Sequence, residues 1–162
     1  MLKKDLVFVL DFDGILTDGK MYYTKEGKYL KCFGPDDFDL LKELSNFIKV
    51  NIITADKRGF PITQKRIVEE MGLKLDLVSG KPHERWEWIR EKYPIEHIIF
   101  MGDGWADYYS LKQANLGITV VDALDHVKKS ADIIIQRKGG ERAVAETILF
   151  LLDKYKIYAI IE

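Results

Sequence analysis

The sequence predicts an α/β protein built on a three-layer, Rossmann-like, doubly wound parallel sheet. Short apolar runs, too short to be helices, alternate along the chain with longer amphipathic stretches. Strands that alternate with helices imply right-handed crossovers, and therefore a parallel sheet with helices on both faces. The first run, residues 6–10, is apolar at every position, which is typical of a central strand covered on both faces.

The later elements each have a local signal. Asp36 is expected to cap the first helix, Gly72 follows the second, and Pro82 begins the third. The predicted strands span residues 6–10, 50–54, 75–78, 97–101, 118–121 and 133–135. The predicted helices span residues 38–47, 61–71, 82–92, 105–114, 125–129 and 142–155.

A projecting β-hairpin is predicted between the first strand and the first helix. Residues 20–23 and 28–33 alternate in polarity around a turn that ends in Gly27. A hairpin with an apolar face is only marginally stable alone, so we expect it to pack on the domain or on another subunit. The apolar tail, residues 157–161, is predicted to be an edge strand or a subunit contact, and Trp105 is assigned to packing.

Composition indicates one domain over residues 1–162 and a cytoplasmic location. The chain has 25 basic and 26 acidic residues, and a net charge of −1 gives no general attraction for nucleic acid. No apolar run approaches the roughly 20 residues that span a bilayer, and no secretory signal is expected. The single cysteine excludes an internal disulfide.

Polar residues follow three of the predicted strands where each strand ends. Asp11 and Asp13 follow the first, Thr54 ends the second, and Asp103 and Asp107 follow the fourth. The carboxyl ends of parallel strands meet at one edge of a sheet, where ligands bind. Acids gathered there repel one another unless a cation offsets their charge, and carboxylates without Cys or His favour Mg²⁺ over zinc. The sequence therefore predicts a magnesium site.

The same residues are suited to phosphoryl transfer. An aspartate carboxylate can attack phosphorus, which suits Asp11, while Asp13 protonates the leaving oxygen and later activates water. The phosphoryl oxygens need donors and cations, for which the Thr54 hydroxyl and the Lys81 ammonium are candidates. Arg85 is the alternative cation. Lys81 is favoured because it comes first, beside a glycine, where the chain can bring it to the phosphate.

These motifs resemble those of a known superfamily. DFDG at residues 11–14, Thr54, Lys81 and GDGWAD at residues 102–107 resemble the four ordered motifs of the haloacid dehalogenase superfamily. More narrowly, DGILTDG at residues 13–19, the hairpin, and QRKGGE at residues 136–141 are similar to the capless phosphatases of 3-deoxy-manno-octulosonate 8-phosphate and their nonulosonate 9-phosphate relatives.

The resemblance implies a capless fold, a small sugar phosphate as substrate and a defined set of roles. Asp11 would be the nucleophile and Asp13 the general acid and base, with Mg²⁺ held by Asp11, the Asp13 carbonyl and Asp103. Asp107 would support the metal or orient Lys81. It also implies a homotetramer in which the hairpins associate and the late glycine pair approaches a neighbour's active site. The candidate substrate-binding residues are Asp37, Asp56, Arg137, Gly139, Gly140 and Arg142.

Three departures from the octulosonate pattern bear on the substrate. Asp56 stands in the second motif where those enzymes usually have arginine. Residues 36–40 lack their glycines but keep an acid at Asp37, and Arg142 replaces a small residue. A different substrate is implied, and the acid at position 56 is more reminiscent of the nonulosonate branch.

Two other functional classes share features with this sequence. A non-catalytic assembly or regulatory module associated with nucleotide-sugar synthesis would keep the fold, but the intact acids argue against it. A phosphoacceptor receiver also has an aspartate at a strand end, but Asp13 would act as a built-in base and hasten loss of the phosphoryl group.

Overall fold

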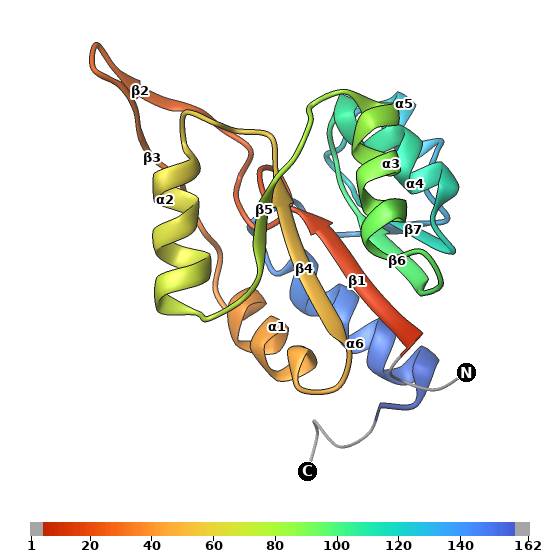
Figure 1. Ribbon diagram of the computed structural model, residues 1–162. Coiled ribbons are helices and arrows are strands. Elements are labelled where there is room, and N and C mark those ends of the chain that lie inside the picture. Colours follow the sequence, from red (N-terminus) through yellow and green to blue (C-terminus); the bar gives the residue numbers. More distant parts are fainter. Residues whose placement is uncertain (1–4, 158–162) are drawn as a thin grey trace.

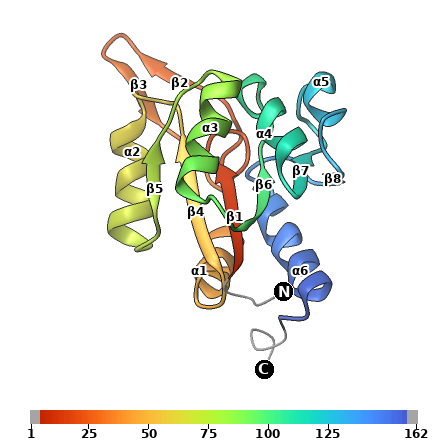
Figure 2. The same ribbon diagram turned by 45° about the vertical axis from the view of Figure 1, so that its right-hand side comes forward.

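The computed structural model describes residues 5–157 and confirms the α/β class. Six parallel strands form one sheet in the order β5-β4-β1-β6-β7-β8, so the chain winds outward in both directions from β1 (Figures 1 and 2). The strands are β1 (Leu6–Asp11), β4 (Lys49–Thr54), β5 (Leu75–Leu77), β6 (His97–Met101), β7 (Leu116–Val120) and β8 (Ile133–Ile135).

Helices cover both faces of the sheet. The first and last helices, α1 and α6, pack against each other on one face, and α3 packs with α4 on the other (Figure 1). The helical elements are α1 (Asp37–Ser45), α2 (Phe60–Gln64), η2 (Lys65–Glu70), α3 (Pro82–Lys92), η3 (Trp105–Asp107), α4 (Tyr108–Gln113), α5 (Asp125–Lys128) and α6 (Ala143–Tyr155). None of these helices is long and apolar enough to cross a membrane.

Strand β1 is the centre of the core. All six of its residues are buried, because β4 and β6 flank it in the sheet and helices cover both faces. Its register pairs Asp11 with Ile53 and Leu10 with Met101. The carboxyl ends of β1, β4 and β6 therefore meet at one edge, as the sequence predicts.

Two predicted helices are divided in the structure. Residues 61–71 form a short α2 that continues as the π-helical η2. Residues 105–114 begin as the 3₁₀ turn η3, and α4 starts only at Tyr108. In that turn the Asp107 carboxylate accepts hydrogen bonds from two backbone N–H groups of the preceding loop, which fixes a tighter geometry than an α-helix.

Two local predictions were wrong. Asp36 has φ 67° and its side chain makes no capping bond within residues 5–157; its carboxylate instead pairs with Arg142. The strand predicted over residues 118–121 begins earlier, at Leu116, so that Gly117 lies inside β7. A side chain at position 117 would collide with the backbone of Leu111, so the glycine permits close packing of α4 on the sheet.

The hairpin is present and projects from the body of the protein (Figure 1). Strands β2 (Tyr22–Thr24) and β3 (Gly27–Leu30) pair antiparallel, and Gly27 has φ 124° in the turn. Phe33 anchors its base through edge-to-face contacts with Phe12 and Phe38. Of the predicted apolar tail, Ile157 is buried and residues 158–161 lie outside the described part of the chain.

Candidate active site

Three carboxylates converge at the carboxyl edge of the sheet. Asp11 ends β1, Asp103 lies in the loop after β6, and Asp107 ends η3. One oxygen from each lies within 4.8 Å of the other two. The structure therefore brings together acids that are almost a hundred residues apart, as the strand ends predict.

This acidic group is short of positive charge. Burial, followed by the charge of Asp107, raises the pKa of Asp11 well above its usual value. Burial and the same neighbour raise the pKa of Asp103 to about 8. Asp103 Oδ1 is buried and has no hydrogen-bond partner among the described residues. An oxygen-only donor set of this kind, with an unpartnered oxygen, fits a hard divalent cation such as Mg²⁺.

Asp107 has both oxygens engaged within the protein. Its Oδ2 accepts the backbone N–H groups of Asp103 and Gly104, at 3.1 and 3.0 Å. Its other oxygen forms an ion pair with Arg85. Asp107 therefore fixes the loop that carries Asp103 and holds the arginine at the same time.

Arg85 is the basic residue that the structure places among the acids. It lies on α3 with its side chain 2% exposed, and Nη1 donates to Asp11 Oδ1 at 3.1 Å and to Asp107. Burial opposes its charge, but Asp107 and Asp11 outweigh burial and raise the pKa of the guanidinium further. The chain thus supplies a cation permanently beside the predicted nucleophile.

Lys81 lies away from these acids. Its side chain is 75% exposed, and its Nζ donates to Glu84 Oε1 at 2.7 Å. It precedes the first turn of α3, whereas Arg85 lies on the buried face of that helix with Ile89, one turn further on. The four-residue spacing of Arg85 and Ile89, which places them on one helix face, was the sequence signal that favoured Arg85. The position of Lys81 beside Gly80 did not indicate which cation lies among the acids.

Asp13 is held by a hydrogen bond and an ion pair. Thr54 Oγ1 donates to its Oδ2 at 3.0 Å, and the Nζ of Lys31 lies 2.7 Å from its Oδ1. Thr54 is fully buried and also accepts the backbone N–H of Asp56. In this structure the Thr54 hydroxyl is therefore directed at Asp13, the neighbouring acid.

A cleft of about 500 Å³ opens over Asp11, Asp13 and Arg85. The hairpin, the loop after β4 and η3 form its walls. The Trp105 ring contacts Tyr108 and His126, as its assignment to packing predicts. It also lines the cleft with 59% of its surface exposed, so that assignment was incomplete. Basic and apolar side chains at the rim are Lys20, Met21, Tyr23, Lys57 and Arg58.

Two lysines of the predicted hairpin contact the site, which the sequence did not predict. Lys28 and Lys31 have side chains that are only 6% and 2% exposed, and both pair with Asp56. Lysine is seldom buried unless paired, and the alternating hairpin pattern gave no indication that these positions face inward. Only the fold brings them to the acid at the end of β4.

The predicted substrate-binding residues do not all reach this cleft. Among those six residues, Asp56 lines it. Arg137 pairs with Glu146, and Arg142 pairs with Asp36. The Gly140 N–H donates to the Ile15 carbonyl at 3.0 Å, and a side chain at Gly139 would collide with the Gly14 carbonyl. Within one copy of the chain, the glycine pair lets the late loop pack against the DFDG loop.

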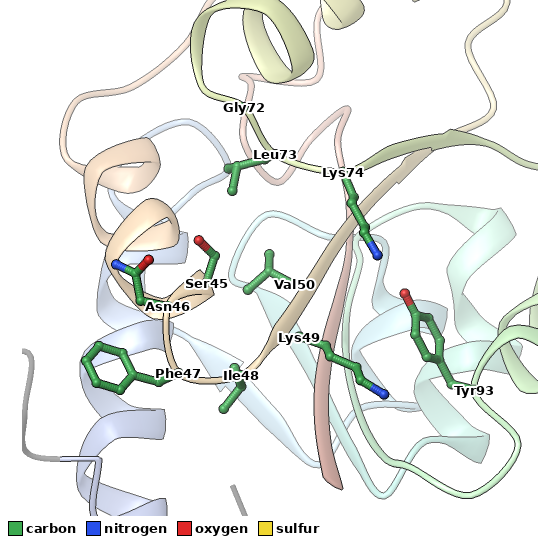
Figure 3. Close-up of a pocket in the computed structure, with 10 residues that line it drawn as sticks. All are labelled: Ser45, Asn46, Phe47, Ile48, Lys49, Val50, Gly72, Leu73, Lys74 and Tyr93. Carbon is green, nitrogen blue, oxygen red and sulfur yellow. The ribbon is translucent and has the colours of Figure 1, made fainter. Parts of the chain in front are cut away.

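A larger pocket lies at the opposite end of the sheet and contains no predicted site residue. It has a volume of about 700 Å³ and is formed where β4 begins and where η2 leads into β5. Figure 3 shows Lys49, Lys74 and Tyr93 on one side of this pocket and Phe47 on the other, and the polar ends of Lys49 and Tyr93 already contact Glu96 and Asn51. Converging acids and a buried cation distinguish the smaller cleft as the candidate active site.

Asp37 lies beneath α6 and is fully buried. Its Oδ1 accepts the Ala145 N–H at 2.8 Å, so it caps α6 from a distant part of the chain. Burial raises the pKa of Asp37 to about 6, although the backbone N–H groups of Ala145 and Val144 act in the opposite direction. Asp37 was expected to bind substrate, but in the structure it joins α1 to α6.

We expect Asp37→Asn to change how stability depends on pH. The folded pKa is about 6, against 3.8 for the unfolded chain, so protonation of Asp37 stabilises the fold below pH 4 and this contribution is lost as the pH rises through 6. The stability of Asp37→Asn relative to wild type should therefore rise by about 2 kcal/mol between pH 4 and pH 7. Urea denaturation in EDTA at several pH values measures it, and a constant difference would contradict the assignment.

Known phosphatases are similar to this chain over most of its length. A family model described as haloacid dehalogenase-like hydrolase matches residues 88–148. A protein of Salmonella typhi named 3-deoxy-D-manno-octulosonate 8-phosphate phosphatase is 29% identical over 154 residues, which cover 90% of this chain and 78% of that protein. The protein of that name from Haemophilus influenzae is 26% identical over 147 residues, covering 88% and 81%.

Solved structures agree in fold. A 3-deoxy-D-manno-octulosonate 8-phosphate phosphatase from Moraxella catarrhalis, in complex with magnesium ion, phosphate ion and a KDO molecule, has a TM-score of 0.79 and 27% identity, covering 93% of this chain and 88% of that one. A cobalt-bound Haemophilus influenzae phosphatase has a TM-score of 0.85 at 22% identity, covering 99% and 94%. The resemblance to haloacid dehalogenase-like hydrolases is confirmed.

Proposed function

We propose that this chain, a haloacid dehalogenase-like hydrolase in fold and motifs, is a magnesium-dependent phosphomonoesterase that forms an aspartyl-phosphate. The observation that carries the proposal is the buried group of Asp11, Asp103 and Asp107 with Arg85 beside it. A dianionic phosphate ester needs positive charge and a nucleophile in one place, and this cleft offers both. The phosphatase relatives support the same reaction.

The first step transfers the phosphoryl group to Asp11. A carboxylate oxygen of Asp11 bonds to phosphorus as the bond from phosphorus to the ester oxygen breaks. Asp13, held by Thr54 and Lys31, gives a proton to the leaving oxygen. The Arg85 guanidinium donates to Asp11 Oδ1, which orients the nucleophile and opposes the rise in its pKa that burial causes.

The second step releases phosphate. Asp13, now a carboxylate, accepts a proton from water as the water oxygen bonds to phosphorus and the bond to Asp11 breaks. Asp11 is regenerated and inorganic phosphate leaves. The two acids of the DFDG motif thus have separate roles, because one ends a strand beside Arg85 and the other lies between Thr54 and Lys31.

Asp11 and Asp103 are the side chains that we propose hold Mg²⁺, together with the Asp13 carbonyl. Bound there, the ion supplies positive charge that offsets the carboxylates and the phosphoryl oxygens. Asp107 supports the site by holding the Asp103 loop and Arg85. Arg85 takes the place that the sequence suggested for Lys81.

For the substrate, we propose a phosphorylated 2-keto-3-deoxy sugar acid of the octulosonate 8-phosphate or nonulosonate 9-phosphate type. The similarity to octulosonate phosphatases and the basic rim residues Lys20, Lys57 and Arg58 support an anionic sugar phosphate. Asp56 in the cleft favours the nonulosonate type. The single domain over residues 1–162, the homotetramer and the cytoplasmic location stay predictions.

Hydrolysis of p-nitrophenyl phosphate with and without Mg²⁺ tests the reaction. We expect release of p-nitrophenolate that requires Mg²⁺ and is abolished by EDTA, because the buried acids lack sufficient positive charge without the ion. No release at any Mg²⁺ concentration would favour the non-catalytic module. A panel of 2-keto-3-deoxy sugar phosphates, compared by kcat/KM, then tests the substrate class.

A further inference from the structure

Lys31 is a buried cation that contacts two acids of the active-site cleft, Asp13 and Asp56. Its side chain is 2% exposed, and its Nζ lies 2.7 Å from Asp13 Oδ1, 3.0 Å from Asp56 Oδ2 and 2.8 Å from Thr63 Oγ1. The contact with Thr63 is a hydrogen bond and the contacts with Asp13 and Asp56 are ion pairs, so three oxygens surround the ammonium. The Phe12 ring, 4.8 Å from Nζ, closes another side. Lys31 therefore has little freedom to move.

The charge on Lys31 is balanced by a chain of alternating ions. Lys28 pairs with Asp56, Asp56 with Lys31, and Lys31 with Asp13. Burial acts to raise the pKa of Asp56, but hydrogen bonds from Lys28, Gly59 and Lys31 lower it to about 2, so this acid stays ionised. A side chain at Gly59 would collide with Asp56, Lys31 and Lys28, which shows how closely these groups are packed.

Stability alone does not account for this arrangement. A buried ion pair has a large desolvation cost and is often no more stabilising than apolar residues of similar volume. A fully buried lysine in a small protein therefore calls for another reason. The contact with Asp13 offers one, because Thr54 and Lys31 each hold a different oxygen of that carboxylate and so define its orientation.

We propose that Lys31 is a positioning residue for Asp13, and that Asp56 and Lys28 hold Lys31 in place. The inference rests on the proposed function, since Asp13 is the proton donor and acceptor in it. Proton transfer requires a fixed geometry, and a carboxyl group held at both oxygens keeps that geometry through both steps. The hairpin thereby contributes directly to catalysis, because Lys28 lies on β3 and Lys31 directly follows it.

Lys31→Met tests the proposal with two substrates. p-Nitrophenolate leaves without a proton, whereas an alkyl alkoxide needs one, so loss of Asp13 positioning should slow release from glycerol 2-phosphate about tenfold more than release from p-nitrophenyl phosphate. Hydrolysis of the phosphoenzyme needs Asp13 with either substrate. In rapid-quench experiments with p-nitrophenyl phosphate, Lys31→Met should therefore show a burst of product followed by turnover slowed about 10- to 100-fold.

Two controls separate positioning from general damage to the fold. Lys28→Met removes a buried charge from the same chain of ions but reaches Asp13 only through Asp56 and Lys31, so at a similar loss of melting temperature it should cause less phosphoenzyme to accumulate than Lys31→Met does. In an Asp13→Asn background, Lys31→Met should cause no further loss of turnover, because its effect acts through Asp13. Lys31→Arg should recover part of the hydrolysis step.

The outcomes distinguish this inference from the proposed function. An active wild type with normal turnover in Lys31→Met overturns the positioning role alone. Lys31 also loses its positioning role if leaving-group release in Lys31→Met slows equally for both substrates, or if the loss of turnover in that variant adds to that of Asp13→Asn. Either result leaves the phosphatase proposal intact. A wild type that forms no phosphoenzyme overturns the proposed function.

Discussion

Asp11→Asn is expected to abolish phosphatase turnover, with kcat for p-nitrophenyl phosphate falling by about a thousandfold or more. The amide is a poor nucleophile, and it removes a charge from the proposed metal site. The change nearly preserves shape, so the carboxamide oxygen can still accept from Arg85 in the place of Asp11 Oδ1. Steady-state hydrolysis in saturating Mg²⁺ measures the effect, and acid-quenched mass spectrometry should detect phosphoenzyme in wild type only.

The matched control for this variant is Asp39→Asn. Asp39 is an exposed acid on α1 and lies outside the active-site cleft, so the same chemical change there should leave turnover near that of wild type. Thermal denaturation should show that Asp11→Asn is folded, because replacing a buried carboxylate by an amide also removes its desolvation cost. Near-normal turnover in folded Asp11→Asn would exclude Asp11 as the nucleophile.

The sheet and the position of its acids could be predicted because they depend on short-range patterns. A continuous apolar strand must be central, and parallel strands share a carboxyl edge, so Asp11 and Asp103 follow from two local motifs. The strand from residue 97 to residue 101 has the predicted bounds for the same reason. A single sequence is therefore sufficient to predict the elements that depend on hydrophobic periodicity and sheet topology.

Contacts between distant loops could not be predicted in this way. Asp37 was expected to face a substrate, but it caps α6, more than a hundred residues away. Lys31 was read as part of an ordinary hairpin, yet its surroundings depend on how the hairpin base meets the loop after β4. Glycines 139 and 140 carry a family motif whose local purpose, close approach to the backbone of residues 14–18, is visible only in three dimensions.

Arg85→Met is expected to have a large effect on both stability and turnover. Arg85 is the ion-pair partner of Asp11 and Asp107, and removing one member of a buried ion pair costs about 3–5 kcal/mol. Without the guanidinium the three clustered acids repel more strongly, so Mg²⁺ should restore part of the lost stability. Thermal denaturation with Mg²⁺ and with EDTA measures this, and the Mg²⁺-dependent rise in melting temperature should be larger than in wild type.

Turnover in Arg85→Met should fall about a hundredfold or more even at temperatures where the variant is folded, because the phosphoryl oxygens and Asp11 lose a fixed donor. Arg85→Lys keeps a charge but cannot reach Asp11, Asp107 and the Ser79 carbonyl together, so it should recover stability better than activity. Lys81→Ala is the matched control: that ammonium is exposed and paired with Glu84, so its loss should change little. If Lys81→Ala lost turnover while Arg85→Lys kept it, Lys81 rather than Arg85 would be the cation at the phosphate.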